Sequence, residues 1–135
     1  MFQHRHSHRV TYADCTIGNH VYYSRYLDLL ETARGELFRA AGHTFSNWQA
    51  AGVIFPVIEV HLRYRAPARY DELIAIDVTV RESAGIRLGF SYRIVGPDNT
   101  LLVEGETRHV CTTLEDKPRR LPPELALALS NPIPV

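Results

Sequence analysis

Side chains able to do chemistry are concentrated between positions 14 and 20 of this chain. A carboxylate at Asp14 and a hydroxyl at Thr16 precede a turn at Gly18, and an amide at Asn19 and an imidazole at His20 follow it. An imidazole, with an unperturbed pKa of about 6.5, can act as a general base near neutral pH. An amphipathic helix follows, and the N–H groups at a helix N-terminus favour negative charge. The stretch is therefore a candidate site for a reaction in which a proton moves and an oxyanion develops.

Each candidate also has a structural interpretation. We expect His20 to be a base, Thr16 to hold a water or to attack after activation, and Asp14 either to orient His20 or to act as the reacting carboxylate itself. Asp14 and Thr16 would share a face if their segment were extended. Alternatively, Asp14 caps the turn, Thr16 is a turn-forming hydroxyl and His20 is a surface residue. Cys15 is expected to be a small buried apolar residue rather than a reactive thiolate.

The elements that must position these groups are a strand and a helix. Loose alternation predicts a strand over residues 6–13. Ser24 is a reasonable N-cap for a helix that runs to Ala41, with Gly42 as its stop. Apolar residues at helical spacing form a broad stripe, which is typical of a helix packed against a sheet: Tyr26, Leu30, Ala33, Leu37 and Ala41.

The rest of the chain predicts an antiparallel sheet. A connector over residues 43–52 contains a short helical piece around Trp48, and a second short helix is expected over residues 124–129. Four alternating segments predict strands at residues 54–64, 73–82, 86–95 and 101–114, and short turns join them mostly as antiparallel neighbours. One helix against one such sheet is an α+β architecture, and we expect a single domain over residues 1–135.

Composition excludes several classes of protein. The formal net charge is zero, so nothing indicates a nucleic-acid partner. No apolar run approaches the roughly 20 residues of a membrane span, and no secretory signal is seen, so we expect no membrane insertion and a reducing cytoplasm. The two cysteines are far apart, without zinc-ligand spacing. His4, His6 and His8 alternate, which we interpret as a half-exposed edge strand rather than a metal site.

Five segments together resemble one known family. The chain is similar to the hotdog-fold 4-hydroxybenzoyl-CoA thioesterase family, which includes acyl-CoA thioesterases of the Tol-Pal type. The resemblance implies a long central helix wrapped by a five-stranded antiparallel sheet, and hydrolysis of acyl-CoA thioesters without a cofactor or metal. The segments are Val10–Asp14 (VTYAD), Val21–Asp28 (VYYSRYLD), Glu31–Arg34 (ETAR), Tyr64–Glu72 (YRAPARYDE) and Val110–Pro122 (VCTTLEDKPRRLP).

The resemblance also assigns roles near the turn. The family's loop carries Asp-x-Asp, and the second Asp, its catalytic carboxylate, falls on Thr16 here, so the active loop is altered. A branch with the same fold, the plant acyl-ACP thioesterases, has a catalytic His before the helix, which matches His20. A backbone N–H at Tyr22 or Tyr23 is the implied oxyanion donor, and Asn19 and Tyr22 are expected to contact substrate.

The resemblance further implies an acyl-CoA partner and a homodimer or homotetramer with sites between subunits. Lys117, Arg119 and Arg120 are the candidates for binding the phosphates of CoA. Glu31 and Arg34 either serve the site of a facing subunit or form an ion pair along the helix, and we favour the ion pair. The alternative function is a non-catalytic protein that binds acyl-CoA or acyl-carrier protein. A hotdog dehydratase is ranked last, because its His–Asp or His–Glu pairing has no counterpart here.

Overall fold

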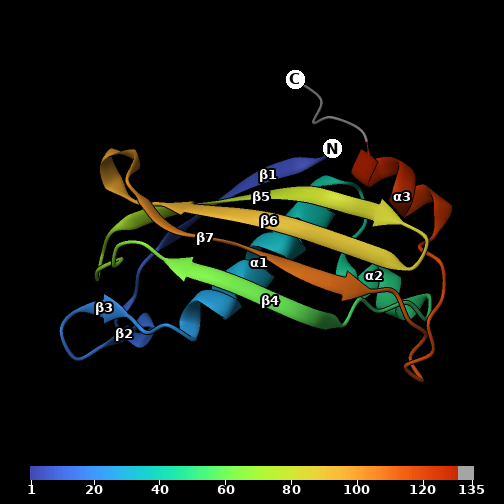
Figure 1. Ribbon diagram of the computed structural model, residues 1–135, viewed down its shortest axis with the longest axis horizontal. Helices are drawn as coiled ribbons and strands as arrows, with labels where there is room; N and C mark the ends of the chain where they lie inside the picture. The colour runs from blue at the N-terminus through green and yellow to red at the C-terminus, as the bar shows by residue number, and fades with distance from the viewer. Residues whose placement is uncertain (131–135) are drawn as a thin grey trace.

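A long helix covers one face of a five-stranded antiparallel sheet in the computed structural model, which describes residues 1–130 (Figure 1). The strand order is β1-β5-β6-β7-β4, and a separate two-stranded hairpin joins β2 to β3. Two single 3-10 turns occur at Tyr12–Asp14 and Pro97–Asn99. The elements are β1 (Gln3–Arg9), β2 (Cys15–Thr16), β3 (His20–Val21), α1 (Arg25–Ala40), α2 (Phe45–Ala50), β4 (Val57–Tyr64), β5 (Leu73–Ala84), β6 (Arg87–Val95), β7 (Leu101–Val110) and α3 (Pro123–Ser130).

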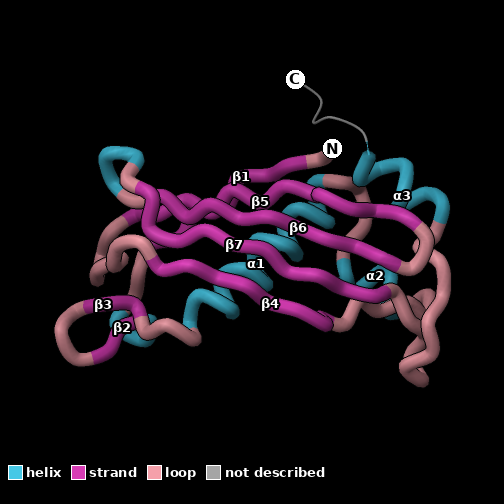
Figure 2. The backbone as a smooth tube through the Cα atoms, in the orientation of Figure 1, coloured by secondary structure: helices cyan, strands magenta, loops and turns pink. Residues whose placement is uncertain are grey.

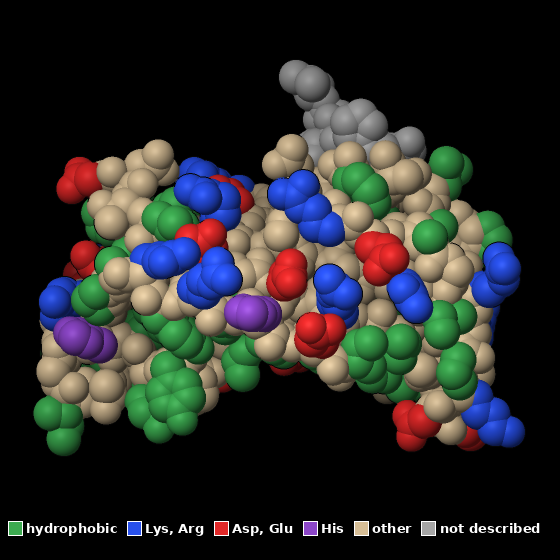
Figure 3. Space-filling view, viewed as in Figure 1, with side chains coloured by type: hydrophobic (Ala, Val, Ile, Leu, Met, Phe, Trp, Pro, Cys, Tyr) green, Lys and Arg blue, Asp and Glu red, His purple; other side chains and the backbone are tan. Residues whose placement is uncertain are grey.

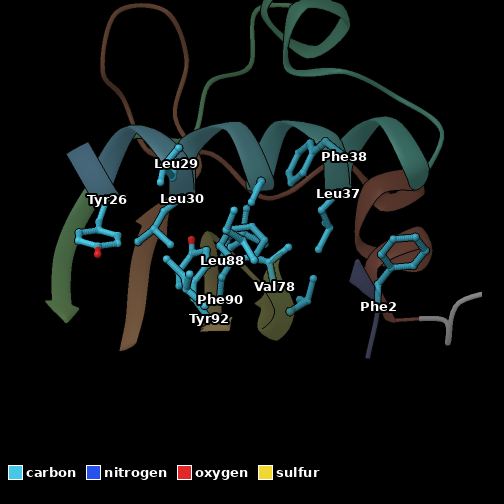
Figure 4. Close-up of a cluster of buried hydrophobic side chains, with 14 of the residues drawn as sticks. Phe2, Tyr26, Leu29, Leu30, Leu37, Phe38, Val78, Leu88, Phe90 and Tyr92 are labelled. Atoms are coloured by element: carbon cyan, nitrogen blue, oxygen red, sulfur yellow. The ribbon is translucent and has the colours of Figure 1, made fainter. Parts of the chain in front are cut away.

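Helix α1 is held against the sheet by its apolar stripe, as the spacing predicts. Figure 4 shows Leu30 and Leu37 directed from α1 toward the sheet, where Leu88, Phe90 and Tyr92 of β6 and Val78 of β5 lie. The helix ends at Ala40, and Gly42 then adopts a left-handed φ of 111°, which glycine tolerates best. Ser24 is the N-cap, as predicted, although its side chain makes no capping hydrogen bond. The buried stripe is Tyr26, Leu29, Leu30, Ala33, Leu37 and Phe38.

The predicted α+β architecture is confirmed, with corrections at strand ends. The first strand begins at Gln3 and ends at Arg9, and residues 12 and 13, which we expected to be strand, belong to a 3-10 turn that ends at Asp14. The last strand ends at Val110 rather than Leu114. Both short helices, α2 around Trp48 and α3 near the end of the described chain, are confirmed. The 3-10 turn matters most, because it changes the direction of Asp14.

The outer face of the sheet carries interspersed positive and negative side chains, whereas apolar groups gather near its β4 edge (Figure 3). Strand β4 pairs only with β7, so its other edge has no partner within the described chain. Four apolar residues of β4 are 43–61% exposed: Val57, Ile58, Val60 and Tyr64. An exposed, apolar, unpaired strand is a surface that proteins ordinarily cover.

Candidate active site

The hairpin of β2 and β3, residues 15–21, brings Thr16 and His20 together. The two residues are direct partners across the antiparallel pair, so their side chains share one face. Gly18 with φ 95° and Asn19 with φ 64° supply the left-handed backbone that this tight turn needs. Both partners are exposed, and no hydrogen bond joins Thr16 Oγ1 to the His20 ring in this conformation. The hairpin therefore presents a hydroxyl and an imidazole side by side to the outside.

Asp14 does not lie on that surface. Its side chain is 2% exposed, because the 3-10 turn directs it inward. Its Oδ2 accepts hydrogen bonds from the Thr11 N–H at 2.9 Å and contacts His8 Nε2 at 2.7 Å, and its Oδ1 accepts from Arg25 at 3.0 Å. The prediction that Asp14 shares a face with Thr16 and orients His20 is wrong, because an extended segment was assumed.

The environment of Asp14 favours its charged form. Burial by itself would raise the pKa of this carboxyl, but the hydrogen bonds from Thr11, His8 and Arg25 outweigh burial and lower the pKa to about 2. Arg25 also pairs with Asp28 at 2.7 Å. The carboxylate of Asp14 thus joins the end of β1, the turn before the hairpin and the first turn of α1.

The helix entry offers backbone donors, but not both of the expected ones. The Tyr22 N–H donates to the carbonyl oxygen of Asp14 at 2.8 Å and is therefore occupied. The N–H groups of Tyr23 and Ser24 have no acceptor among the described residues. They stand at the N-terminus of α1, where the helix dipole favours an anion. The Tyr23 N–H therefore remains the candidate oxyanion donor, whereas the Tyr22 N–H is excluded from that role because its hydrogen bond is already made.

Two neighbouring side chains serve the hairpin structurally. Asn19 Oδ1 accepts a hydrogen bond from the Tyr70 N–H at 3.0 Å, which fixes the hairpin to the turn before β5. Cys15 is half-buried and its thiol donates to the Thr11 carbonyl oxygen at 3.4 Å. Burial, with the nearby Asp14 charge, raises the pKa of Cys15, so the thiol stays protonated as expected. The aromatic rings of Tyr22 and Tyr23, 45% and 61% exposed, lie 4.7 Å apart at the helix entry.

A cavity of about 370 Å³ opens between the middle of α1, helix α2 and the segment 53–57. Figure 2 shows α2 at the opposite end of the molecule from the hairpin of β2 and β3. Its wall is mostly apolar and includes Phe45, Val53, Phe55, Leu88 and Phe90. Its polar members are Glu31, Arg34, Gln49 and His109. Small-molecule sites have this size and this mixture of an apolar wall with a few polar groups.

Arg34 is the unexpected member of the cavity wall. It is 8% exposed, and it points from α1 into the sheet, where it donates to Tyr92 Oη at 3.1 Å. The predicted ion pair with Glu31 is wrong, because Arg34 has no carboxylate within 4.0 Å in the described chain. The sequence held a signal for this placement: Arg34 lies four residues after Leu30 and four before Phe38, on the buried stripe.

Beyond Arg34, a chain of buried hydrogen bonds passes from Tyr92 through Thr107 to His109, and each group donates to the next. His109 Nδ1 lies 3.0 Å from the Phe55 carbonyl oxygen, which only accepts, so Nδ1 carries the proton. Burial lowers the pKa of His109 to about 4, so Nε2 accepts from Thr107 at 2.9 Å. Thr107 in turn accepts from Tyr92 at 2.6 Å. We did not identify these inward-facing strand residues from sequence, because polar side chains at buried strand positions resemble outward-facing ones.

The segment with basic residues that follows β7 lies at the end of the molecule near the cavity, away from the hairpin of β2 and β3. Thr112 forms bridges with both Ile54, which lines the cavity, and Pro118. The segment that carries Lys117, Arg119 and Arg120 therefore lies at the opposite end of the sheet from the hairpin of β2 and β3 (Figure 1), and Arg119 and Arg120 line a separate pocket with Leu121. Within one subunit, the predicted catalytic and phosphate-binding groups are not brought together.

Comparisons with known proteins agree with this architecture. The family model of the thioesterase-like superfamily matches residues 10–129. The chain is 38% identical over 115 residues to the acyl-CoA thioester hydrolase YbgC of Escherichia coli, covering 84% of this chain and 86% of that one. The crystal structure of the hypothetical protein TT1821 from Thermus thermophilus superposes with a TM-score of 0.88 at 35% identity, covering 93% and 96% of the two chains. A probable thioesterase from Bartonella henselae gives 0.83 at 29% identity, covering 89% and 99%.

The sheet wrapped around α1 is a hotdog fold, as expected. The chain belongs to the thioesterase-like superfamily. Within residues 1–130, no helix is long and apolar enough to cross a membrane, and no group of three potential metal ligands is present.

Proposed function

We propose that this protein hydrolyses acyl-CoA thioesters to a free acid and CoA, in sites that form between two subunits. The observation that carries the proposal is the pairing of Thr16 with His20 beside the unoccupied Tyr23 N–H at the start of α1. Thioester hydrolysis needs a base and a donor for the oxyanion, and the candidates are His20 and the Tyr23 N–H, three residues apart. The relatedness to acyl-CoA thioester hydrolase YbgC supports the same activity.

A homodimer through β4 would complete each site. Strand β4 starts at Val57, which lines the cavity, and ends at Tyr64, whose hydroxyl donates to the Tyr23 carbonyl oxygen at 3.1 Å. A twofold axis between two β4 edges would pair them antiparallel. The hairpin end of one subunit would then meet the cavity end of its partner. Such a dimer covers the exposed apolar residues of β4, and we further propose that dimers pair into a homotetramer.

The mechanism assigns the reacting steps to few groups. His20 takes a proton from a water, and the water oxygen attacks the thioester carbonyl carbon. The carbonyl oxygen becomes an oxyanion that accepts a hydrogen bond from the Tyr23 N–H. The C–S bond then breaks, and the CoA thiolate leaves and is protonated by His20. Thr16 holds the water beside His20, and Asn19 and Tyr22 line the approach of the substrate.

Asp14 acts as a positioning residue in this proposal. Its carboxylate holds His8, Thr11 and Arg25, and so fixes the hairpin relative to α1. Lys117, Arg119 and Arg120 of the cavity-bearing subunit would meet the CoA phosphates, since a dimer brings them to the partner's hairpin. No cofactor takes part. The proposed compartment is the cytoplasm, where the free thiols of Cys15 and Cys111 stay reduced.

The test is thiol release from a panel of aliphatic and aromatic acyl-CoAs. We expect wild-type turnover, and a loss of 100-fold or more in kcat for His20→Ala, since a general base contributes about 10²–10⁴. His4→Ala is the matched control, because His4 lies on β1 at the far edge of the sheet from β4. Wild-type rates in His20→Ala would overturn the assignment of His20.

The second candidate function is a non-catalytic acyl-CoA or acyl-carrier binder. It is favoured by one observation, the Thr16 hydroxyl at the position of the family's catalytic carboxylate. A binder would be stabilised by acyl-CoA, with a rise in Tm, without releasing thiol. Thiol release at any catalytic rate rejects this candidate.

A further inference from the structure

The buried guanidinium of Arg34 lacks a charged partner. It offers five N–H donors, and among the described residues only Tyr92 Oη accepts from it, at 3.1 Å. Arg34 belongs to the cavity wall, so the small part of it that is exposed faces the cavity. A charge held away from water is costly unless it is paired. The remaining donors are therefore available to a group inside the cavity.

The neighbouring network cannot neutralise this charge. The chain of donors runs from Arg34 to Tyr92, Thr107 and His109, and ends on the Phe55 carbonyl oxygen. Each hydroxyl in it already accepts one bond and donates one, and every member beyond Arg34 is neutral. The network therefore fixes the position of the guanidinium without supplying an anion.

The cavity has a polar rim and an apolar interior with one cation. Glu31, Gln49 and Val57 are exposed at the rim, whereas Leu88 and Phe90 are buried with Arg34. In the dimer proposed above, the rim meets the partner's hairpin, where the thioester would react. An acyl group that enters from the rim would therefore place its far end near Arg34.

We propose that the cavity binds the acyl group and that Arg34 selects acyl chains that end in a carboxylate. The inference rests on the proposed function and names its substrate class. The apolar wall contacts the methylene groups, and the guanidinium, held at the buried end of the cavity, pairs with the terminal carboxylate through charge-assisted hydrogen bonds. Glu31 carries a negative charge at the rim, but it is exposed to water, which screens it.

The experiment compares adipoyl-CoA with hexanoyl-CoA, which share a six-carbon chain and differ in the terminal carboxylate. For wild type we expect kcat/KM at least tenfold higher with adipoyl-CoA, because the bond is made to a charged group in a buried site. Arg34→Met should abolish this preference, which is read as the ratio of kcat/KM for the two substrates within each variant. Tyr92 keeps its donor bond to Thr107 in this variant, so no buried donor is left unpaired.

A control variant and a binding measurement separate effects on folding and catalysis from recognition of the terminal carboxylate. Arg39→Met is the matched control, because Arg39 is exposed on the same helix and pairs with Glu36, and it should keep the wild-type preference. A Tm measurement with free adipate or hexanoate needs no turnover. We expect adipate to raise the Tm of wild type more than hexanoate does, and Arg34→Met to lose that difference.

The outcomes distinguish a failure of carboxylate recognition by Arg34 from a failure of the proposed hydrolase activity. Hydrolysis of both substrates with equal kcat/KM, or an unchanged preference in Arg34→Met, overturns the role of Arg34 and leaves the hydrolase intact. No thiol release from either substrate or from the rest of the acyl-CoA panel overturns the hydrolase. In that case an adipate-specific rise in Tm that depends on Arg34 supports the recognition site, and its absence overturns it.

Discussion

Replacing Asp14 with asparagine separates a positioning role from a catalytic one. The substitution keeps the size of the side chain and removes the charge that His8, Thr11 and Arg25 surround. We expect a large loss of stability and a small change in the turnover of the folded enzyme. A carboxylate that reacts with substrate would show the reverse.

The magnitude follows from the pKa of Asp14. This pKa falls from 3.8 to about 2 on folding, against the effect of burial, and each pKa unit corresponds to about 1.4 kcal/mol. The charged form therefore contributes roughly 2.5 kcal/mol at neutral pH. We expect Asp14→Asn to lower the free energy of unfolding by about 2–3 kcal/mol at pH 7.

The contribution of Asp14 to the free energy of unfolding should depend on pH. Because the folded-state pKa is lowered, the contribution is fully present above about pH 4 and is lost as pH falls toward 2. The protonated carboxyl of Asp14 and the amide that replaces it are both uncharged, so the difference between wild type and variant should shrink over that range. Urea titrations at pH 7, 4 and 3, at one protein concentration, measure it.

A matched control and a refuting result complete this test. Asp77 pairs with Arg5 on the outer face of the sheet, partly exposed, so Asp77→Asn should cost at most about 1 kcal/mol. If Asp14→Asn unfolded at the wild-type urea concentration but lost thiol release more than 100-fold, Asp14 would belong to the reacting groups. The positioning role would then be wrong.

Three other predictions concern the network, the sheet and the edge. The pKa of His109 falls from 6.5 to about 4 on folding, so stability should decline by about 3 kcal/mol from pH 7 to 4; His109→Gln should flatten this part of the curve in urea titrations. Gly105→Ala would place a Cβ against the His61 carbonyl oxygen and should cost about 3 kcal/mol or more, whereas at Gly89 the nearest atom is 3.5 Å away and the same change should cost under about 1 kcal/mol; equal losses would contradict the steric argument. Val60→Asp, at the exposed edge of β4, should convert the dimer to monomer by light scattering, and an unchanged mass would reject the proposed interface.

The sheet and the central helix could be predicted from the sequence because their signals are local. Alternation along β5 and β6 places Ile76, Val78 and Phe90 inside, and a helical period places Leu30 and Leu37 on one face of α1. Each of these patterns follows from backbone geometry and the burial of apolar groups. They needed no knowledge of distant contacts.

The candidate site depended on contacts that the local pattern does not encode. Asp14 was expected to share a face with Thr16 in an extended segment, but a 3-10 turn buries it against His8 and against Arg25, which lies eleven residues along the chain. The pairing of Thr16 with His20 depends on the hairpin turn between them. The Gly18-Asn19 pair in the sequence had already indicated a turn at this place. The residue types of the candidate site were thus evident from the sequence, whereas the structure was needed to show which side chains face solvent and which are buried.

What the sequence alone determined is the α+β architecture and the position of the candidate turn along the chain, because both depend on patterns within a few neighbouring residues. The tertiary structure decided which polar groups are buried. Arg34 shares a helix with Glu31, yet it turns inward to Tyr92, 58 residues away, and His109 reaches the Phe55 carbonyl oxygen, 54 residues away. Such partners meet only when the sheet has formed, since a hydrogen bond depends on the position of both atoms rather than on either segment's own preference.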